Sequence, residues 1–160
     1  MKKERFENRY SMKAIVPIIE EYISRSKEVI FTAKGNSMRP LLRNGKDQLI
    51  LRAYNREELP VGTVVLYQRA DMSFSAHRII GKNDNGFIMM GDFQTRREEG
   101  ISPSSIKAVV VGFIKKGREF SADNKWYLCY MRFWMKSKFI RKCYIFGVSK
   151  IIALKRRLPK

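Results

Sequence analysis

The chain has 160 residues, of which 44% are apolar, and a formal net charge of +18 at pH 7. This length suits one domain with attachments, because a single hydrophobic core is usual at this size. The charge is uneven, since residues 125–160 hold eleven Lys or Arg and no Asp or Glu. A basic block of this kind predicts an anionic partner, either nucleic acid or acidic lipid.

Membrane and export signals are weak. No apolar run reaches the roughly 18 to 20 residues needed to cross a bilayer, and the charged start Met1–Arg5 is not followed by an apolar signal core. We therefore expect a cytoplasmic chain that neither spans the membrane nor is exported. Cys129 and Cys143 would lie about 21 Å apart on one continuous helix, too far for a disulfide, so reduced thiols are expected.

The first 27 residues are predicted to form an N-terminal helical segment. Residues 1–11 are charged and lack periodicity, which predicts frayed chain. Residues 12–26 carry apolar side chains at helical spacing and should form an amphipathic helix. This helix is predicted to pack on the following domain, because Glu20 and Glu21 oppose adsorption to acidic lipid.

Residues 28–117 are predicted to form a compact, mainly β domain. Short β-branched and aromatic runs alternate there with turn signals such as Asn83–Gly86, and residues 93–105 are polar and loop-like. The expected strands are Glu28–Ala33, Gln48–Ala53, Thr63–Gln68, Ala76–Gly81, Phe87–Met90 and Ile106–Lys115. Many short strands at this spacing favour antiparallel all-β architecture.

Residues 118–160 are predicted to be a basic, aromatic-rich helical tail. Asp123 is a candidate helix N-cap, and Gly147 is a candidate break. Aromatic and basic residues are interleaved, which predicts a peripheral anchor on the inner, acidic face of the membrane. A docking helix for a partner protein is the next hypothesis, and binding to nucleic acid is the third.

Two stretches suggest catalytic chemistry. Ser37 lies in Gly35–Pro40, after a predicted strand, and His77 is the single histidine of the chain. A serine hydroxyl needs a base to accept its proton, and imidazole has a pKa near working pH. Asp92 follows a strand one hairpin beyond His77 and is the candidate to orient the imidazole. Amides around Gly35 to Ser37 could stabilise an oxyanion.

In order, GNSMRPLLRNGKD, LPVGTVVLY, SAHRIIGK and GDFQTRREEGI resemble the boxes of the signal peptidase I family and its LexA-like relatives, over residues 34–114. The resemblance implies a coiled antiparallel β fold with Ser37 as nucleophile and His77 as base, and it supports Asp92. It implies a peptidase that trims a leader or propeptide, with small side chains beside the cleaved bond. No metal or cofactor is expected.

The residues around the nucleophile are predicted to bind substrate. Gly35 and Asn36 belong to the oxyanion region, Met38 is a wall for the substrate residue next to the cleaved bond, and Pro40 restricts the backbone after Ser37. Lys82 is a weaker candidate base, because it lies beyond the matching box and would need desolvation to be neutral.

Two other classes of function stay open. One is a degenerate peptidase fold that binds through its basic tail to membrane, protein or nucleic acid. The other, a self-cleaving repressor, is disfavoured because the segment before Glu28 is short for a helix-turn-helix module and contains no Ala-Gly cleavage pair.

Overall fold

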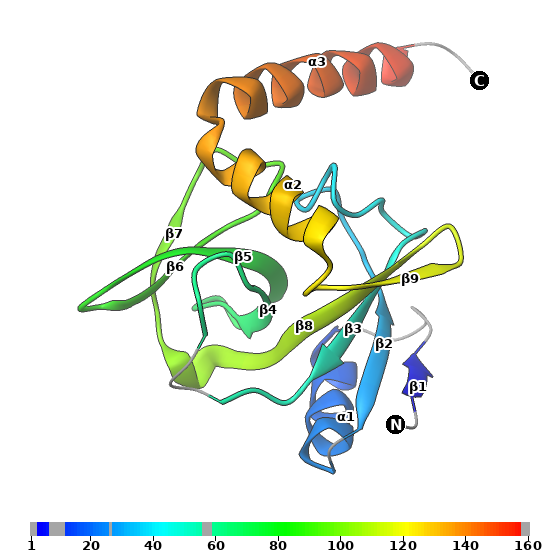
Figure 1. Cartoon of the computed structure of the whole chain (residues 1–160), viewed down its shortest axis with the longest axis vertical. Helices are drawn as coiled ribbons and strands as arrows, with labels where there is room; N and C mark the ends of the chain where they lie inside the picture. The colour runs from blue at the N-terminus through cyan, green and yellow to red at the C-terminus, as the bar shows by residue number, and fades with distance from the viewer. Residues whose placement is uncertain (1–2, 7–11, 26, 56–58, 158–160) are drawn as a thin grey trace.

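The computed structural model describes residues 3–6, 12–25, 27–55 and 59–157. These residues form a nine-stranded sheet with the order β1-β2-β3-β8-β4-β5-β6-β7, in which β9 pairs with β8 (Figure 1). The strands are β1 Lys3–Phe6, β2 Glu28–Thr32, β3 Gln48–Arg52, β4 Val64–Gln68, β5 Phe74–Asn83, β6 Gly86–Met90, β7 Glu98–Ile101, β8 Ile106–Lys115 and β9 Arg118–Ser121. All pairs are antiparallel except β1 with β2, so the predicted mainly β, antiparallel class is confirmed.

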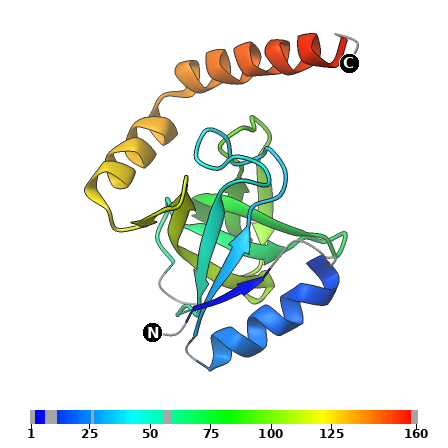
Figure 2. The same ribbon diagram turned by 90° about the vertical axis from the view of Figure 1, so that its right-hand side faces the viewer.

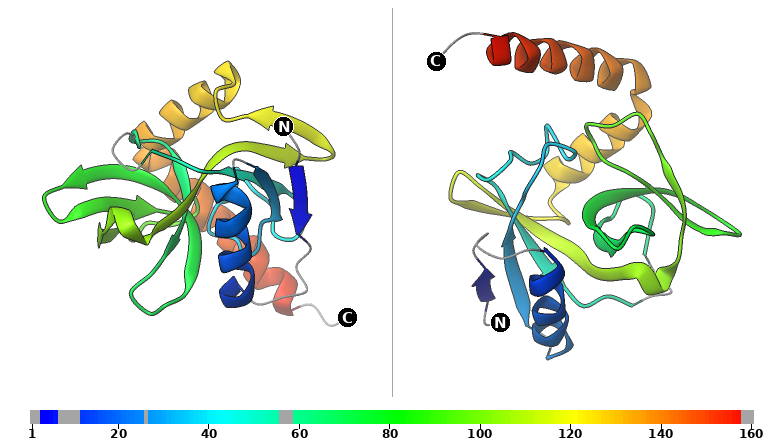
Figure 3. Two further views of the ribbon diagram at one scale, coloured as in Figure 1. Left: turned by 90° about the horizontal axis from the view of Figure 1, so that it is seen from below. Right: turned by 180° about the vertical axis from the view of Figure 1, so that it is seen from behind.

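The helix α1, Met12–Ser24, lies against the sheet beside β2 and β8 (Figures 1 and 3). Its apolar stripe, made of Ile15, Val16, Ile19 and Ile23, is almost completely buried in the main core. This confirms the predicted packing on the β domain. The spacing of the stripe explains it, because residues three and four apart share one helix face.

Two apolar clusters occupy opposite faces of β4 and β5. The main core includes Val64 and Leu66 on one face, and the smaller cluster contains Val65, Tyr67 and Ile79 on the other. Successive side chains of a strand point to opposite faces. A residue in β5 is therefore directed to one cluster or the other by whether its position is odd or even.

The sheet extends beyond the predicted limits of 28–117. Residues 3–6, predicted to be frayed, form β1 in parallel register with β2, and residues 118–121 form β9. Part of the predicted 93–105 loop is β7, which pairs with β6. These strands lack apolar alternation and depend on their neighbours' free edges, so local sequence does not reveal them.

The tail consists of two helices, α2 at Lys125–Lys136 and α3 at Lys138–Arg157. The N-cap of α2 is Asn124, whose side chain accepts from the amides of Trp126 and Tyr127, rather than the predicted Asp123. The helices separate at Ser137, and α3 continues through Gly147. Helix α2 lies against the β domain, and Tyr144 near the start of α3 lies edge-on to Phe93 at 5.9 Å between ring centroids. The rest of α3 extends away from the β domain (Figure 2).

Cys129 and Cys143 are both exposed and free. Among the described helices, none combines the length and the apolar character that a membrane crossing requires.

Candidate active site

Ser37 lies in the loop that joins β2 to β3, and polar contacts define the shape of this loop. The amide of Ala33 donates to the carbonyl of Asp47 at 2.9 Å, and the amide of Gly35 donates to Oδ1 of Asn44 at 2.9 Å. Gly35 has a φ of +85°, which suits glycine. The loop therefore doubles back on itself and presents Ser37 near its tip.

A buried carboxylate supports the base of the same loop. Asp47 is fully buried and accepts from the Arg43 guanidinium, with Nη2 to Oδ1 at 2.6 Å, and from the Arg43 amide at 2.8 Å. Burial alone would raise the pKa of Asp47, but the bonds from Arg43 lower it overall. The carboxylate stays ionised because a buried charge is tolerated when it is paired and hydrogen-bonded.

The end of β6 holds the main chain of Ser37. The Phe93 amide donates to the Ser37 carbonyl at 2.7 Å. A Cβ on Gly91 would lie 2.6 Å from that same carbonyl oxygen. Gly91 is thus required for a close approach of two backbones, and the Gly91-Asp92-Phe93 turn sets the position of Ser37.

Ser37 borders a small apolar pocket of about 100 Å³. Met38 and Leu42 from its own loop line the pocket together with Leu66 and Ala76 from the sheet. Met38, the predicted wall, is nearly fully buried there. A volume this small accepts a short side chain and excludes a large one.

His77 is almost completely buried, with 1% of its surface exposed. Its Nδ1 lies 3.0 Å from the Tyr67 hydroxyl and 3.4 Å from Oε1 of Glu98. Tyr67 in turn donates to Oε2 of Glu98 at 2.9 Å, and Arg69 binds both oxygens of that carboxylate. The imidazole is thus the inner end of a chain of hydrogen bonds that ends on a carboxylate.

This chain of hydrogen bonds determines the tautomer of His77. Burial opposes the ionisation of Glu98, but Arg69 and Tyr67 lower its pKa overall, so it is a carboxylate and only accepts. The single hydroxyl proton of Tyr67 goes to Glu98, and Nδ1 must therefore supply the proton between the imidazole and Tyr67. Nε2 then carries a lone pair, and the hydrogen bond that this ring makes within the described part of the chain is the one at Nδ1.

Burial of the imidazole lowers the pKa of His77 to about 4, while the carboxylate of Glu98 acts in the opposite direction. At neutral pH the ring is therefore uncharged. An uncharged imidazole with an available Nε2 can accept a proton, and Glu98 stabilises the cation that results.

The turn after β6 connects the strand that pairs with β5 to the Ser37 loop. Arg78 pairs with Met90, so continuing this register by one residue puts Gly91 opposite His77. Side chains opposite each other lie on one face of a sheet, and the direction of a Cβ on Gly91 is toward the Ser37 carbonyl. The Ser37 carbonyl therefore lies beside the turn that follows the partner strand of His77, while Ser37 borders the pocket on the Leu66 and Ala76 face. No hydrogen bond joins Ser37 Oγ to His77 in the described chain.

Asp92 does not contact His77 by a hydrogen bond. It forms a two-pronged ion pair with Arg78, with Nε to Oδ1 at 2.8 Å and Nη2 to Oδ2 at 2.6 Å. The reason is strand periodicity, because Asp92 lies one residue beyond Gly91 and so on the opposite face from His77. The predicted orienting contact is replaced by that of Tyr67 and Glu98.

The Arg78–Asp92 pair is buried beneath α2. Arg78 is 1% and Asp92 3% exposed. Tyr127 accepts from Arg78, Tyr130 donates to the Asp92 carboxylate, and Trp134 donates through Nε1 to the Asp92 carbonyl at 3.1 Å. The first tail helix is thus part of the structure that supports the turn beneath Ser37.

The predicted oxyanion residues divide into two groups. The Gly35 amide is occupied by Asn44, whereas the amides of Ser37 and Met38 donate to no acceptor within the described chain. Asn36 is exposed, and its carbonyl accepts from the Arg39 amide. Pro40 lines a different, larger groove.

Sequence reasoning missed Tyr67, Arg69 and Glu98. Tyr67 was part of a predicted strand and Glu98 part of a predicted loop, and neither had a distinguishing motif. The available signal was the pairing of β4 with β5, which puts Tyr67 on the same face as His77. Among the described residues, no three His, Cys, Asp or Glu side chains are grouped to hold a metal ion.

Comparison with known proteins found no matching family model and no matching curated protein. The candidate site therefore stands on the geometry of this chain.

Substitution of Gly91 tests the contact that positions Ser37. Gly91→Ala would place a Cβ against the Ser37 carbonyl, and a neighbouring backbone cannot move away cheaply. We expect about a tenfold or greater loss of kcat in a peptide cleavage assay, because a small misplacement of a reacting group is costly. Gly117→Ala is the control, because a Cβ there would meet no atom within 4 Å, while the φ of +76° at Gly117 also favours glycine. Equal kcat for Gly91→Ala and wild type would contradict the contact's role.

Proposed function

We propose that this chain is a serine endopeptidase similar to signal peptidase I of the Ser-His type, which cleaves a leader or propeptide from a peptide substrate. The observation that carries the proposal is the Ser37 loop seated against Gly91, together with a buried, neutral His77 on the neighbouring strand, whose Nε2 makes no hydrogen bond within the described chain. The ordered sequence boxes point to the same residues.

In the proposed reaction, Ser37 Oγ attacks the scissile carbonyl carbon while its proton passes to His77 Nε2. The amides of Ser37 and Met38 stabilise the oxyanion. The carbonyl reforms as the carbon–nitrogen bond breaks, and the imidazolium returns its proton to the leaving amine. Water then hydrolyses the acyl-enzyme by the same route. The hydrogen bond from Ser37 Oγ to Nε2 forms with substrate bound, since catalytic hydrogen bonds are often long in free enzymes.

The substrate preference follows from the pocket beside Ser37. Its volume of about 100 Å³ and its apolar lining favour a small side chain next to the cleaved bond. Ser75 and Phe74, at the start of β5, also line it, so an extended peptide lying there would run beside a strand.

A fluorophosphonate probe tests whether Ser37 is the nucleophile. We expect wild type to be labelled at Ser37 and Ser37→Ala to be unlabelled. Ser75→Ala is the matched control, because Ser75 lines the same pocket and is half-buried as well. Labelling that survives Ser37→Ala, or that is absent from wild type, would reject the peptidase proposal.

A second candidate function is a peptidase fold that only binds. The observation favouring it is the lack of a hydrogen bond between Ser37 Oγ and His77 within the described chain. Under this reading Ser37→Ala keeps full biological activity, whereas under the peptidase proposal it abolishes it.

We further propose that α3 holds the protein on an acidic membrane surface. Phe139, Phe146 and Leu154 are at least 63% exposed and, at spacings of seven and eight, share one face of the helix. Exposed apolar residues on a basic helix are typical of interfacial binding.

Vesicle sedimentation tests this attachment. Wild type should sediment with phosphatidylglycerol-containing vesicles and remain in the supernatant with phosphatidylcholine alone. Phe146→Glu should reduce the sedimented fraction strongly, because it places a charge on the apolar face. Ser149→Glu, which adds the same charge beside that face, should have a smaller effect. Equal loss in both variants would reject insertion of the apolar face.

A further inference from the structure

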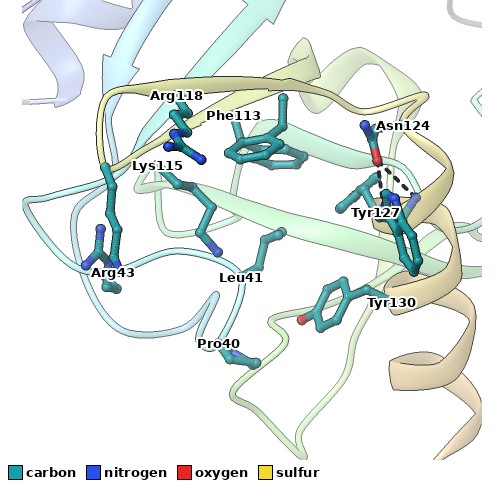
Figure 4. A pocket seen from close by; sticks show the side chains of 12 residues that line it. Pro40, Leu41, Arg43, Phe113, Lys115, Arg118, Asn124, Tyr127 and Tyr130 are labelled. Atoms are coloured by element: carbon teal, nitrogen blue, oxygen red, sulfur yellow. Dashed lines mark hydrogen bonds between the residues drawn. The ribbon is translucent and has the colours of Figure 1, made fainter.

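A second, larger cavity also borders the Ser37 loop and shares no lining residue with the small pocket. It has a volume of about 1120 Å³ and lies between the loop at Pro40–Leu41, the β8–β9 hairpin and the start of α2 (Figure 4). We call it the basic–aromatic groove. The proposed peptidase chemistry does not use it.

One end of the groove is strongly basic. Arg43, Lys115, Lys116 and Arg118 line it, and no Asp or Glu is among its lining residues. Arg43 is paired with Asp47, but the other three make no ion pair within the described chain. The hairpin's acid, Glu119, lies on the other face of β9, where Lys3 contacts it at 2.5 Å. The groove thus has an excess of positive charge.

The other end is aromatic. Trp126, Tyr127 and Tyr130 of α2 face Phe113 and Phe120 of the hairpin across it. Trp126 is 84% exposed, which is unusual for so large an apolar side chain. Figure 4 shows the two ends as separate groups, with Arg43, Lys115 and Arg118 together and Tyr127 and Tyr130 on the α2 side.

The separation of the basic end from the aromatic end indicates which class of ligand fits the groove. A single-stranded nucleic acid alternates phosphates with bases, so its sites interleave cations with aromatic residues. The groove instead presents a block of cations and then a block of apolar surface. It also shares a wall with the loop that carries Ser37, since Pro40 and Leu41 follow Ser37 by three and four residues. A chain with a bond at Ser37 could continue into the groove.

We propose that the basic–aromatic groove binds a peptide segment in which an acidic run adjoins apolar or aromatic residues, and that it acts as a docking site for the precursor substrate. This inference extends the proposed peptidase function, and its binding test does not need catalysis. Rim cations contribute chiefly to recognition and association rate, while the aromatic end supplies buried apolar area.

Fluorescence anisotropy with full-length Ser37→Ala protein tests the groove. The probe is a fluorescein-labelled peptide of four glutamates followed by two leucines and two phenylalanines. We expect saturable binding that weakens with added salt, and much weaker binding of the same peptide with lysines in place of glutamates. A peptide of the same composition with its residues interleaved should bind less well, because it cannot match the two ends.

Two variants locate the binding. Lys116→Asn combined with Arg118→Glu should weaken the probe about tenfold, and Trp126→Ala should weaken it as well. Asparagine is chosen because residue 116 has a φ of +50°. The control, Lys138→Glu with Lys142→Gln, removes the same net charge from exposed positions of α3 and should leave the affinity within about twofold.

Competition decides between ligand sources. Unlabelled acidic peptide should displace the probe from the groove. If only phosphatidylglycerol vesicles or a 12-nucleotide single-stranded DNA displace it, or if the groove variants and the control bind the probe equally, the proposal is wrong. Absence of fluorophosphonate labelling from a wild-type protein that still binds the peptide would reject the peptidase function and leave the groove assignment standing.

Discussion

His77→Gln is expected to lower kcat for peptide cleavage by at least about a thousandfold, with little change in KM. The reason is that His77 Nε2 is the group proposed to accept the proton of Ser37, and no other histidine exists in the chain. Substrate contacts near Met38 and Ala76 would remain. The measurement is steady-state cleavage of a peptide with small residues at the bond, and Ser37→Ala should lose a similar factor.

The hydrogen-bond chain behind His77 offers the control variants. Tyr67→Phe removes the acceptor for the Nδ1 proton and should cost less than His77→Gln, because Glu98 still lies 3.4 Å from Nδ1. Asp92→Asn should affect kcat per folded molecule least of the three. A larger kcat effect from Asp92→Asn than from Tyr67→Phe would contradict the assignment of the orienting role.

The pH profile reports on the same network. Because burial lowers the pKa of His77 to about 4, the neutral base persists well below pH 6.5, and the acid limb of kcat/KM should lie between about pH 4 and 5. Glu98 raises the pKa of His77, so Glu98→Gln should move this limb to lower pH and reduce the rate at neutral pH. An acid limb that Glu98→Gln leaves unchanged would show that Glu98 does not influence the titration of His77.

Arg78→Met is expected to destabilise the fold by about 3–5 kcal/mol, because it leaves the Asp92 carboxylate buried without its partner. Burial opposes the charge on Arg78, yet Asp92 raises the pKa of Arg78 overall, so the guanidinium is charged in the folded chain. Arg78 also donates to the Gly62 carbonyl and to Tyr127, and its loss would weaken the seat of α2. Urea unfolding measures the change.

The double variant Arg78→Met with Asp92→Asn separates pairing from burial. Removing both charges should cost less than the sum of the single changes, because each single variant leaves one buried charge without its partner and the double variant leaves none. Arg25→Met, which breaks a contact with Glu21 at an exposed site, should cost about 1 kcal/mol or less. Additive losses for Arg78 and Asp92 would show that the two residues act independently.

Much of the fold could be predicted because its signals are local. The short apolar runs in 48–52 and 64–68, the Asn83–Gly86 turn and the apolar stripe of α1 each follow from residues close in the chain. Strands β1, β7 and β9 could not be predicted this way. They exist because other strands leave edges to pair with, and an edge is a property of the assembled sheet.

For the candidate site, the sequence by itself determined the candidate nucleophile, the single histidine and the glycine before Asp92. Only the tertiary structure decided which acid meets His77. Strand alternation directs Asp92 to Arg78 on one face, while the pairing of β4 with β5 brings Tyr67 to His77 on the other, and β7 brings Glu98. Those partners are 10 to 31 residues apart along the chain. Their meeting depends on sheet register, which no local pattern of side chains encodes.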